Sequence, residues 1–429
     1  MHCRILLALL LGLLSPGLEA KKCSVNENEQ SSVTYLLRQM VNSYNPNDIP
    51  NPSILLALRL ARDHSLTTEK EMIKQLKEDA VSRVQNNVTF SSGTVALYVL
   101  ALQASCDDPQ NVSALNSSVN LVQLLQKKYN DELENIQHHS SPITNYYQLG
   151  LDVLALCLQN VSVNISALLV PTCEARQYTY GSQFSVDTAS VAVLGLTCVK
   201  ARKDLSEAEK KKVRCSVCCL VKKILNKGAS CGVIGNIYST GLAMQALSVS
   251  DECYSRPLWN CNKTLQKVLR EIPLSTFDNP MAASQITPSL EGKTYLDVRG
   301  KTCAADQDNL TISTTVPPTT SPPANITVTY TVVDGVNNTF NNSIIITVPL
   351  GSTFLTVMQK AQASNNNTFS FTVTPSSWGP YVTSVHGLAA SDSERTYWQL
   401  LSGSNPLMQG VGDYKPLDGE NLVVKLSTY

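Results

Sequence analysis

Several apolar segments of the chain begin with side chains that can hydrogen-bond a polar ligand. In "SQFSVDTASVAVLGLTCVK" (residues 182–200), Asp187 and Thr188 come directly before an apolar run that predicts a helix over 189–199. Other apolar segments start in the same way, at Thr94, Thr144, Asn236 and Ser239. Carboxylates accept hydrogen bonds, and hydroxyls and amides both donate and accept them. The same residue types are also the preferred N-caps of helices. Each of these residues is therefore a cap, a ligand contact, or both.

The helices that carry these residues form a repeat. Six segments share a small or polar start followed by Ala and Leu: "PSILLALRLAR", "GTVALYVLALQ", "YYQLGLDVLALCL", "VDTASVAVLGLTC", "YSTGLAMQALSV" and "PMAASQITPSL". They recur at roughly 40 to 50 residues, the spacing of helix-pair repeats. Amphipathic helices are expected between them, for example over 68–84 and 118–134. One nearly all-apolar helix alternating with one half-polar helix predicts an inner and an outer ring. We therefore expect a mainly α protein, with an α6/α6 toroid over residues 21–303.

The chain changes character after Cys303. Residues 304–324 include "TISTTVPPTTSPPAN", a Pro/Thr-rich run typical of an extended linker. From residue 325, the alternating runs "ITVTYTVV", "SIIITV" and "FSFTVT" predict strands. "TFLTVMQKAQAS" predicts a helix, and "DGENLVVKL" a turn and a last strand. Residues 325–429 are thus expected to form a small β-rich α+β domain.

The composition indicates a secreted protein. Residues 1–20 have the pattern of a signal peptide, with Arg4 ahead of an apolar run over 5–14 that is too short to span a membrane. The formal net charge of the 429 residues is zero, which argues against a nucleic-acid partner. Asn-x-Ser/Thr sequons indicate a glycosylated surface. They lie at Asn87, Asn111, Asn116, Asn160, Asn164, Asn262, Asn309, Asn325, Asn337, Asn341 and Asn366.

Long strings on both sides of the linker resemble a known family. They are "NYYQLGLDVLALCL", "VDTASVAVLGLTC", "GNIYSTGLAMQALSV", "GKTYLDV", "SWGPYVTSV" and "TYWQLLSG". The chain resembles the cobalamin (vitamin B12) carriers, namely intrinsic factor, haptocorrin and transcobalamin. The resemblance implies an α6/α6 barrel and a small β-rich domain with cobalamin held between them. Cobalamin would be a transported ligand and not a catalytic cofactor. Its identity follows from the resemblance alone, whereas the toroid follows from the repeat.

The resemblance also implies a set of ligand-facing residues. Asp187 would accept hydrogen bonds from the amide side chains of the corrin, and Tyr147 would supply a flat face. The alternatives are capping for the polar residues and packing for the aromatic ones. Exposure of Trp398 and Leu400 without a ligand would be a liability, which favours a ligand-facing role. The full set is Thr94, Thr144, Asn145, Tyr146, Tyr147, Gln148, Gln183, Asp187, Asn236, Ser239, Gln285, Ser377, Trp378, Gly379, Trp398, Gln399 and Leu400.

Two positions depart from the transcobalamin pattern. Transcobalamin places a cobalt-coordinating histidine where this chain has Gln183 and Phe184, and a glutamine where it has Thr94. A neutral amide is a poor ligand for a transition metal. We therefore expect no metal ligand from the protein and favour the haptocorrin and intrinsic factor branches. The histidines offer no better axial ligand; they are His2, His64, His138, His139 and His386.

Removal of Cys3 with the signal peptide leaves twelve cysteines, an even number in an oxidising compartment. The resemblance implies three bridges, Cys23–Cys261, Cys106–Cys303 and Cys157–Cys198. Zinc binding and additional disulfides are both open for the remaining cysteines, and a secreted chain favours disulfides. These are Cys173, Cys215, Cys218, Cys219, Cys231 and Cys253.

We compare two main functions. The first is a non-enzymatic carrier, expected to be secreted and monomeric, that binds cobalamin and other corrinoids. It would be taken up through a cell-surface receptor and would not insert into membranes; a transcobalamin-type plasma carrier is the variant of this function. The second is a glycoside hydrolase, since α6/α6 toroids also host enzymes that use paired carboxylates. Asp187 has no obvious second carboxylate beside it among the rim residues, which favours the carrier.

Overall fold

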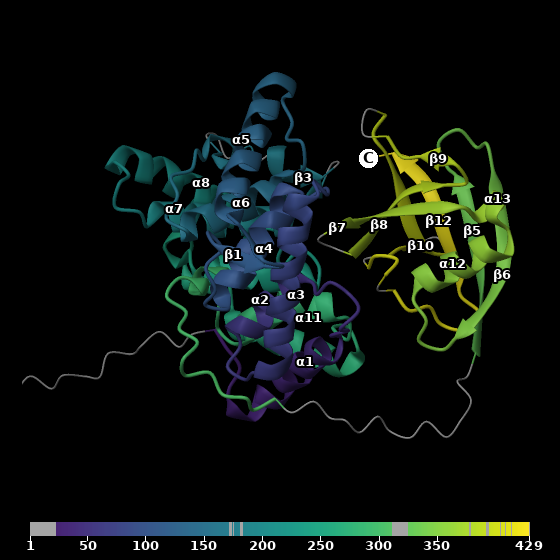
Figure 1. The fold of residues 1–429 in the computed structure, drawn as a ribbon, viewed down its shortest axis with the longest axis horizontal. Coiled ribbons are helices and arrows are strands. Elements are labelled where there is room, and N and C mark those ends of the chain that lie inside the picture. The colour runs from purple at the N-terminus through teal and green to yellow at the C-terminus, as the bar shows by residue number, and fades with distance from the viewer. Residues whose placement is uncertain are drawn as a thin grey trace, which may run out of the picture.

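The computed structural model describes residues 23–170, 174, 176–180, 183–310, 325–376, 379–391, 394–403, 405–407, 409–412 and 414–428. The expected signal peptide over 1–20 lies outside this part of the chain, as do residues 311–324 of the expected linker. The described residues form a helical barrel and a smaller β-rich domain (Figure 1). Each has its own hydrophobic core.

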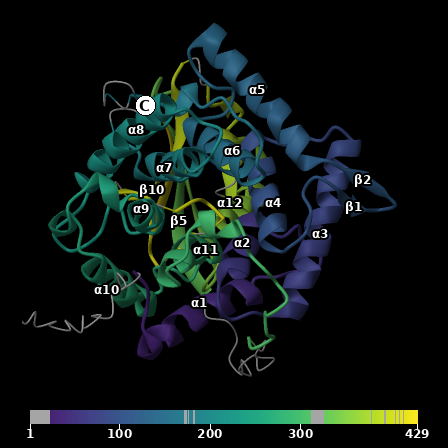
Figure 2. The ribbon, with the colours of Figure 1, turned by 90° about the vertical axis from the view of Figure 1, so that its left-hand side faces the viewer.

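Six helices form a closed inner ring. They are α2 (Pro52–Leu60), α4 (Ser92–Ala104), α6 (Tyr146–Leu158), α7 (Val186–Lys200), α9 (Ser239–Ser248) and α11 (Pro280–Leu290). Each packs on the next in this order, and α11 packs on α2. Figure 2 looks along the barrel axis and shows this ring in front of the small domain. These helices are the six repeated segments, so the predicted toroid is confirmed.

The inner helices pack closely because their contact faces carry small residues. A Cβ added to Gly195 of α7 would lie 3.1 Å from the carbonyl oxygen of Gly150 of α6. A Cβ added to Gly241 of α9 would lie 2.5 Å from the carbonyl oxygen of Gln285 of α11. A side chain at Gly241 would force α9 and α11 apart, and one at Gly195 would require α6 and α7 to shift.

The outer layer consists of α1 (Gln30–Asn42), α3 (Leu66–Gln85), α5 (Leu121–His139), α8 (Glu207–Leu225) and α10 (Cys261–Glu271). Helix α5 begins later than the expected residue 118. Residues Ser117–Val119 form strand β2, which pairs with β1 (Val112–Ala114), and the Asn120 side chain caps the helix.

The connection between α6 and α7 has no long helix among its described residues. It contains the 3-10 turns η2 (Ser166–Leu168) and η3 (Arg176–Tyr178) and a ribbon of β3 (Thr179–Tyr180) and β4 (Gln183–Phe184). This connection returns the chain to the end of the barrel at which α6 began, so α6 and α7 run parallel although its described residues form no outer helix.

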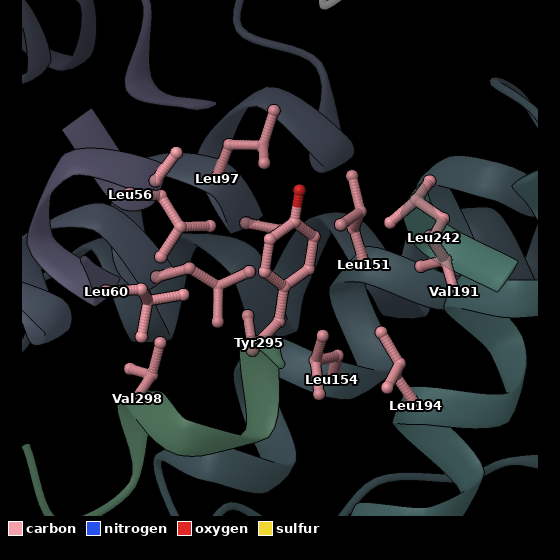
Figure 3. Close-up of a cluster of buried hydrophobic side chains, with 14 of the residues drawn as sticks. Leu56, Leu60, Leu97, Leu151, Leu154, Val191, Leu194, Leu242, Tyr295 and Val298 are labelled. Carbon is pink, nitrogen blue, oxygen red and sulfur yellow. The ribbon is translucent and has the colours of Figure 1, made fainter. Parts of the chain in front are cut away.

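Tyr295 fills the interior of the barrel. Its ring lies among apolar side chains of the inner helices, including Leu56, Leu97 and Leu151 (Figure 3). It belongs to η7 (Tyr295–Val298), whose first backbone N–H donates to Gln245 Oε1 (2.9 Å). The barrel interior is therefore a packed core, and a large ligand has room only at the mouth.

The three bridges implied by the resemblance are all present: Cys23–Cys261, Cys106–Cys303 and Cys157–Cys198. Cys218 is bonded to Cys253, and Cys219 is also disulfide-bonded. Cys215 and Cys231 are free and exposed. Within the described residues no group of three or more His, Cys, Asp or Glu could hold a metal ion. Two cysteines of the "CSVCC" segment, Cys218 and Cys219, are thus in disulfides, whereas its first cysteine, Cys215, is not.

Residues 304–310, expected to be linker, lie on the barrel. Asp306 pairs with Arg59 and with Lys301 (3.0 Å), and His64 lies between Asp306 and Glu69. The backbone N–H groups of residues 309 and 310 both donate to the carbonyl of His64. Buried charges need such partners. The linker expected from residue 304 therefore starts no earlier than residue 311.

The small domain is built on a five-stranded sheet with the order β11-β10-β12-β5-β6. Its elements are β5 (Asn325–Asp334), β6 (Asn341–Pro349), α12 (Phe354–Ser364), α13 (Asn366–Phe369), β7 (Phe371–Ser376), β8 (Gly379–Val385), β9 (Leu388–Ala389), β10 (Thr396–Ser402), β11 (Asn405–Pro406) and β12 (Asn421–Thr428). Strands β7, β8 and β9 form a second sheet, and β7 and β8 extend toward the barrel (Figure 1).

The predicted β-rich domain with one main helix, α12, is confirmed. In β5, buried residues alternate with more exposed ones, as the alternating sequence predicts. Within the described residues, no helix is long and apolar enough to cross a membrane.

Candidate functional site at the mouth of the barrel

The N-terminal ends of the inner helices lie at one mouth of the barrel, which we call the rim. Side-chain oxygens cap most of these ends: Asn51, Ser91, Asn145, Ser185 and Asn279 accept hydrogen bonds from backbone N–H groups of their own helices. These bonds satisfy amides that an isolated helix end leaves unpaired. The caps are thus mostly neighbours of the polar residues that the sequence singled out: Asn145 is a cap, whereas Thr94, Thr144 and Asp187 are not.

Asp187 is not the cap of α7, contrary to the simpler of its two interpretations. Ser185 takes that role, and its Oγ accepts a hydrogen bond from the backbone N–H of Thr188 (3.2 Å). Asp187 lies in the first helical turn, where its Oδ2 accepts a hydrogen bond from Ser239 Oγ (2.8 Å). The carboxylate thus joins the ends of two neighbouring inner helices.

The second oxygen of Asp187 is unsatisfied. Oδ1 is buried and has no hydrogen-bond partner. Burial raises the pKa of Asp187 above its ordinary value, and hydrogen bonds from Ser239 and from the backbone N–H of Asp187 itself partly oppose this. A buried acceptor without a donor costs free energy. A neutral donor such as a primary amide N–H of a ligand would remove this cost.

Tyr147 lies close to the same carboxylate. Burial raises its pKa well above the usual value, and nearby Tyr295 and Asp187 raise it further. Tyr146 is half-buried, with its ring centroid 6.3 Å from that of Tyr178. Of the two tyrosines, Tyr147 is therefore the one beside Asp187, while Tyr146 contacts the α6–α7 connection.

The expected site residues on α4 and α6 hold each other in place. Gln148 Oε1 accepts a hydrogen bond from the backbone N–H of Gly93 (3.1 Å), one residue before Thr94. Thr94 Oγ1 lies 2.8 Å from Ser91 Oγ, and Asn145 Oδ1 accepts from the N–H of Gln148 (3.0 Å). These polar groups are already used within the protein. They shape the rim, whereas Asp187 Oδ1 has a vacant acceptor position.

Sequence reasoning missed two buried carboxylates, Glu132 beside Thr144 and Asp152 close to Glu132. Glu132 of α5 is 2% exposed, and its Oε1 accepts a hydrogen bond from Thr144 Oγ1 (2.6 Å). Asp152 of α6 is fully buried, and its carboxyl lies close to Ser92 and Glu132. Both residues lie inside helices, α5 and α6, and the alternation of polar and apolar residues there does not mark them as buried. The only sequence signal was an acidic residue within the otherwise apolar run "YYQLGLDVLALCL".

On the other side of Asp187, Asn236 Oδ1 accepts a hydrogen bond from the N–H of Ser239 (2.8 Å), which is a capping role. Gln285 is buried on α11 and its backbone faces Gly241 of α9. Both residues lie next to α9, so the structure brings them to the same part of the barrel as Asp187.

Gln183 lies in β4, two residues before the cap of α7, which puts its backbone at the rim. Its side chain lies outside what the structure describes. Phe184 is half-buried and packs against the barrel core. Ser377 and Trp378 lie outside the described residues, and Gly379 is the first residue of β8.

The expectation that Trp398 is exposed toward a ligand is wrong. Its side chain is 3% exposed and lies in the core of the small domain. Its ring stacks on that of Phe340, with 6.4 Å between the ring centroids. Strand β10 lies inside the sheet between β11 and β12, so its core-facing residues are covered. Leu400 also packs on this core, and Gln399 Oε1 accepts a hydrogen bond from Ser427 (3.1 Å).

A hydrogen bond joins Tyr238, beside the rim, to Gln409 of the small domain. Burial raises the pKa of Tyr238 above its usual value, and a hydrogen bond from the Gln409 side chain partly offsets this effect. Tyr238 directly precedes α9 and is therefore a neighbour of Ser239. The small domain thus faces the part of the rim that carries Asp187.

Comparisons with known proteins identify the family. Residues 5–324 match the model of the eukaryotic cobalamin-binding protein family, and residues 351–428 match a domain of unknown function, DUF4430. The chain is 41% identical to human transcobalamin-1 over 100% of this chain and 99% of that protein. It is 36% identical to human cobalamin binding intrinsic factor over 95% and 94%, respectively.

A solved structure agrees with these matches. The crystal structure of haptocorrin in complex with Cbi superposes with a TM-score of 0.77 at 39% identity, covering 95% of this chain and 99% of that one. The rat transcobalamin-2 sequence is 34% identical over 88% of each chain. The barrel, the small domain and the rim between them are therefore features of a shared fold, and the chain belongs to the eukaryotic cobalamin-binding protein family.

Proposed function

We propose that this protein is a carrier that binds one cobalamin or related corrinoid between the rim and the small domain. The observation that carries the proposal is Asp187 Oδ1, a buried acceptor without a donor at the mouth of the barrel. A corrin ring bears several amide side chains, whose N–H groups are the neutral donors that this oxygen lacks. Membership in the family supports the identity of the ligand.

The proposed contact residues differ in whether their polar groups are already hydrogen-bonded within the protein. Asp187 and Tyr147 face the ligand directly, while Gln148, Asn145, Thr94 and Thr144 hold the rim in shape and contact ligand through their remaining polar atoms. Asn236, Ser239 and Gln285 line the opposite side. From the small domain we propose the segment 377–379, because β7 and β8 extend toward the barrel. We do not include Trp398, since its side chain is buried.

Affinity would come from burial of a large ligand between two surfaces with many neutral hydrogen bonds in place of water. The two domains belong to one chain, so the small domain stays at a high effective concentration near a ligand on the rim. Closure over the ligand would then slow its release.

We propose that the protein catalyses no reaction on its ligand. A glycoside hydrolase requires two carboxylates that reach its substrate. Glu132 and Asp152, two neighbouring carboxylates close to the rim, are 2% and 0% exposed. They point into the protein and cannot contact a sugar without a rearrangement of α5 and α6.

The finer assignment is to the haptocorrin and intrinsic factor branches and not to the transcobalamin type. Gln183 supports this, because an amide at that position leaves the upper face of the cobalt without a protein ligand. We further propose that the protein is secreted, that it is monomeric, and that a cell-surface receptor takes up the loaded form. Signal-peptide-like residues, disulfides and sequons support secretion.

The test is direct. The secreted protein is purified, mixed with excess aquocobalamin and passed through a gel-filtration column. We expect corrin absorbance to co-elute with the protein at about one ligand per chain. Elution of the protein without corrin absorbance would refute the proposal, and the same column gives the oligomeric state.

A further inference from the structure

Glu132 connects two inner helices at the rim. It lies on the outer helix α5, but its carboxylate reaches inward to Ser92, the first residue of α4, and to Thr144, which precedes the cap of α6. Oε1 accepts hydrogen bonds from Ser92 Oγ (3.2 Å) and Thr144 Oγ1 (2.6 Å), and Oε2 accepts from the N–H of Thr144 (3.1 Å). One side chain thus fixes the starts of two adjacent helices.

The environment of Glu132 is unusual for a carboxylate. The side chain is 2% exposed, and none of the ion pairs found among the described residues includes it. The three donors that hydrogen-bond it are neutral, and the buried carboxyl of Asp152 lies close enough to interact with it. Removing a charge from water without an ion pair is costly, so such a residue is a poor source of stability. Its three hydrogen bonds do, however, fix the position of Thr144 relative to Ser92.

The residues that Glu132 holds are those that the proposed function needs. Thr144 begins the segment Thr144–Gln148, which includes Tyr147 beside Asp187. The same segment is attached to α4 through the bond from Gly93 N–H to Gln148 Oε1. A Cβ at Gly93 would lie 2.5 Å from Gln148 Cγ, so the two helices leave no free space at this point.

We propose that Glu132 is the positioning residue of the corrinoid-facing segment Thr144–Gln148, holding it against α4 in the geometry that retains the ligand. This inference rests on the proposed function. Glu132 does not touch the ligand in this scheme. It acts through Thr144, and its loss allows the segment to move while the barrel core remains intact.

The variant is Glu132→Gln, which keeps the shape but places an amide NH2 where one carboxylate oxygen accepts a hydrogen bond. The matched control is Glu134→Gln on the same helix, where the side chain is exposed. Each full-length protein is loaded with cobalamin, and the release rate is measured after addition of excess competing ligand. We expect release from Glu132→Gln to be about tenfold faster or more, and release from the control to be unchanged.

Hydrogen exchange separates positioning from general destabilisation. In the ligand-free Glu132→Gln protein, amides of residues 144–148 should exchange faster, while amides within α7 and α9 keep their protection. Thr144→Val removes only the hydroxyl donor and gives a milder second variant if Glu132→Gln does not fold. The effects of the two substitutions on release should be less than additive, because both remove the same contact.

Two results would overturn the inference. The first is an unchanged release rate in Glu132→Gln, or in Thr144→Val if only that variant folds, while the wild-type protein retains cobalamin. The second is faster exchange spread evenly over the barrel, which would make Glu132 a residue of general stability. Failure of the wild-type protein to bind any corrinoid is a different outcome, since it refutes the proposed function together with the inference.

Discussion

Replacement of Asp187 by alanine is the sharpest test of the proposed site. In the ligand-free protein, Oδ2 has a donor in Ser239 and Oδ1 has none, so the carboxylate is only half satisfied. A corrin amide N–H would complete it. Removal of the side chain should therefore weaken cobalamin binding without an equal loss of stability in the ligand-free protein.

The magnitude follows from the value of one hydrogen bond to a buried carboxylate. Such a bond contributes about 1 to 3 kcal/mol, which corresponds to a rise in the Kd for cobalamin of about 5- to 150-fold. The stability of the free protein should change little. Ser239 loses its acceptor, but the variant also loses a buried carboxylate whose pKa is raised by burial.

The raised pKa of Asp187 makes its contribution to the stability of the protein depend on pH. A carboxyl group with a raised pKa in the folded state binds more protons there than in the unfolded state. Its contribution to stability therefore falls as pH rises from the ordinary Asp value through the folded pKa. At neutral pH the wild-type protein carries this penalty and Asp187→Ala does not, which offsets the lost bond to Ser239.

The assay combines equilibrium binding of cobalamin with thermal unfolding of the ligand-free protein. Asp131→Ala, an exposed carboxylate on α5, is the control for loss of charge near the rim. An unchanged Kd in a folded Asp187→Ala protein would refute the reasoning, whatever its melting temperature. It would mean that Asp187 serves only to join α7 to α9.

Three further predictions follow from the structure. Asp152→Asn should raise the melting temperature at neutral pH, because burial holds the pKa of Asp152 well above its usual value; the gain should vanish as pH falls to about 4, and melting curves across that range test it. Proteolytic cleavage within residues 311–324 should leave bound cobalamin in place but slow capture if done first, as measured by ligand retention and uptake rates; equal capture by cut and intact protein would contradict this. Gln183→His should shift the visible spectrum of bound aquocobalamin toward a nitrogen-ligated form and slow replacement of the cobalt-bound water by azide, whereas a wild-type spectrum already of that form would show that another side chain ligates the cobalt.

Local features of the sequence determined most of the secondary structure. The six inner helices could be predicted because their apolar residues cover all sides and their caps lie within four residues of the groups they bind. Alternation in Asn325–Asp334 predicted strand β5 in the same way. The resemblance to a family added the three long-range disulfides, which no spacing rule could have supplied.

The tertiary structure decided what each polar residue does. Asp187 and Ser239 are 52 residues apart, and Glu132 and Ser92 are 40 apart, so no periodic pattern relates them. Their contacts exist because closure of the ring brings the starts of neighbouring helices together. The same holds for His64, 242 residues from Asp306, whose contact places residues 304–310 on the barrel.

Burial was likewise decided by the assembled fold. The sequence favoured an exposed, ligand-facing Trp398, whereas the position of β10 inside the sheet buries its side chain. Whether a side chain faces solvent, ligand or core depends on which elements cover its face. That covering is a property of the packed chain, because it is made by residues far away in the sequence.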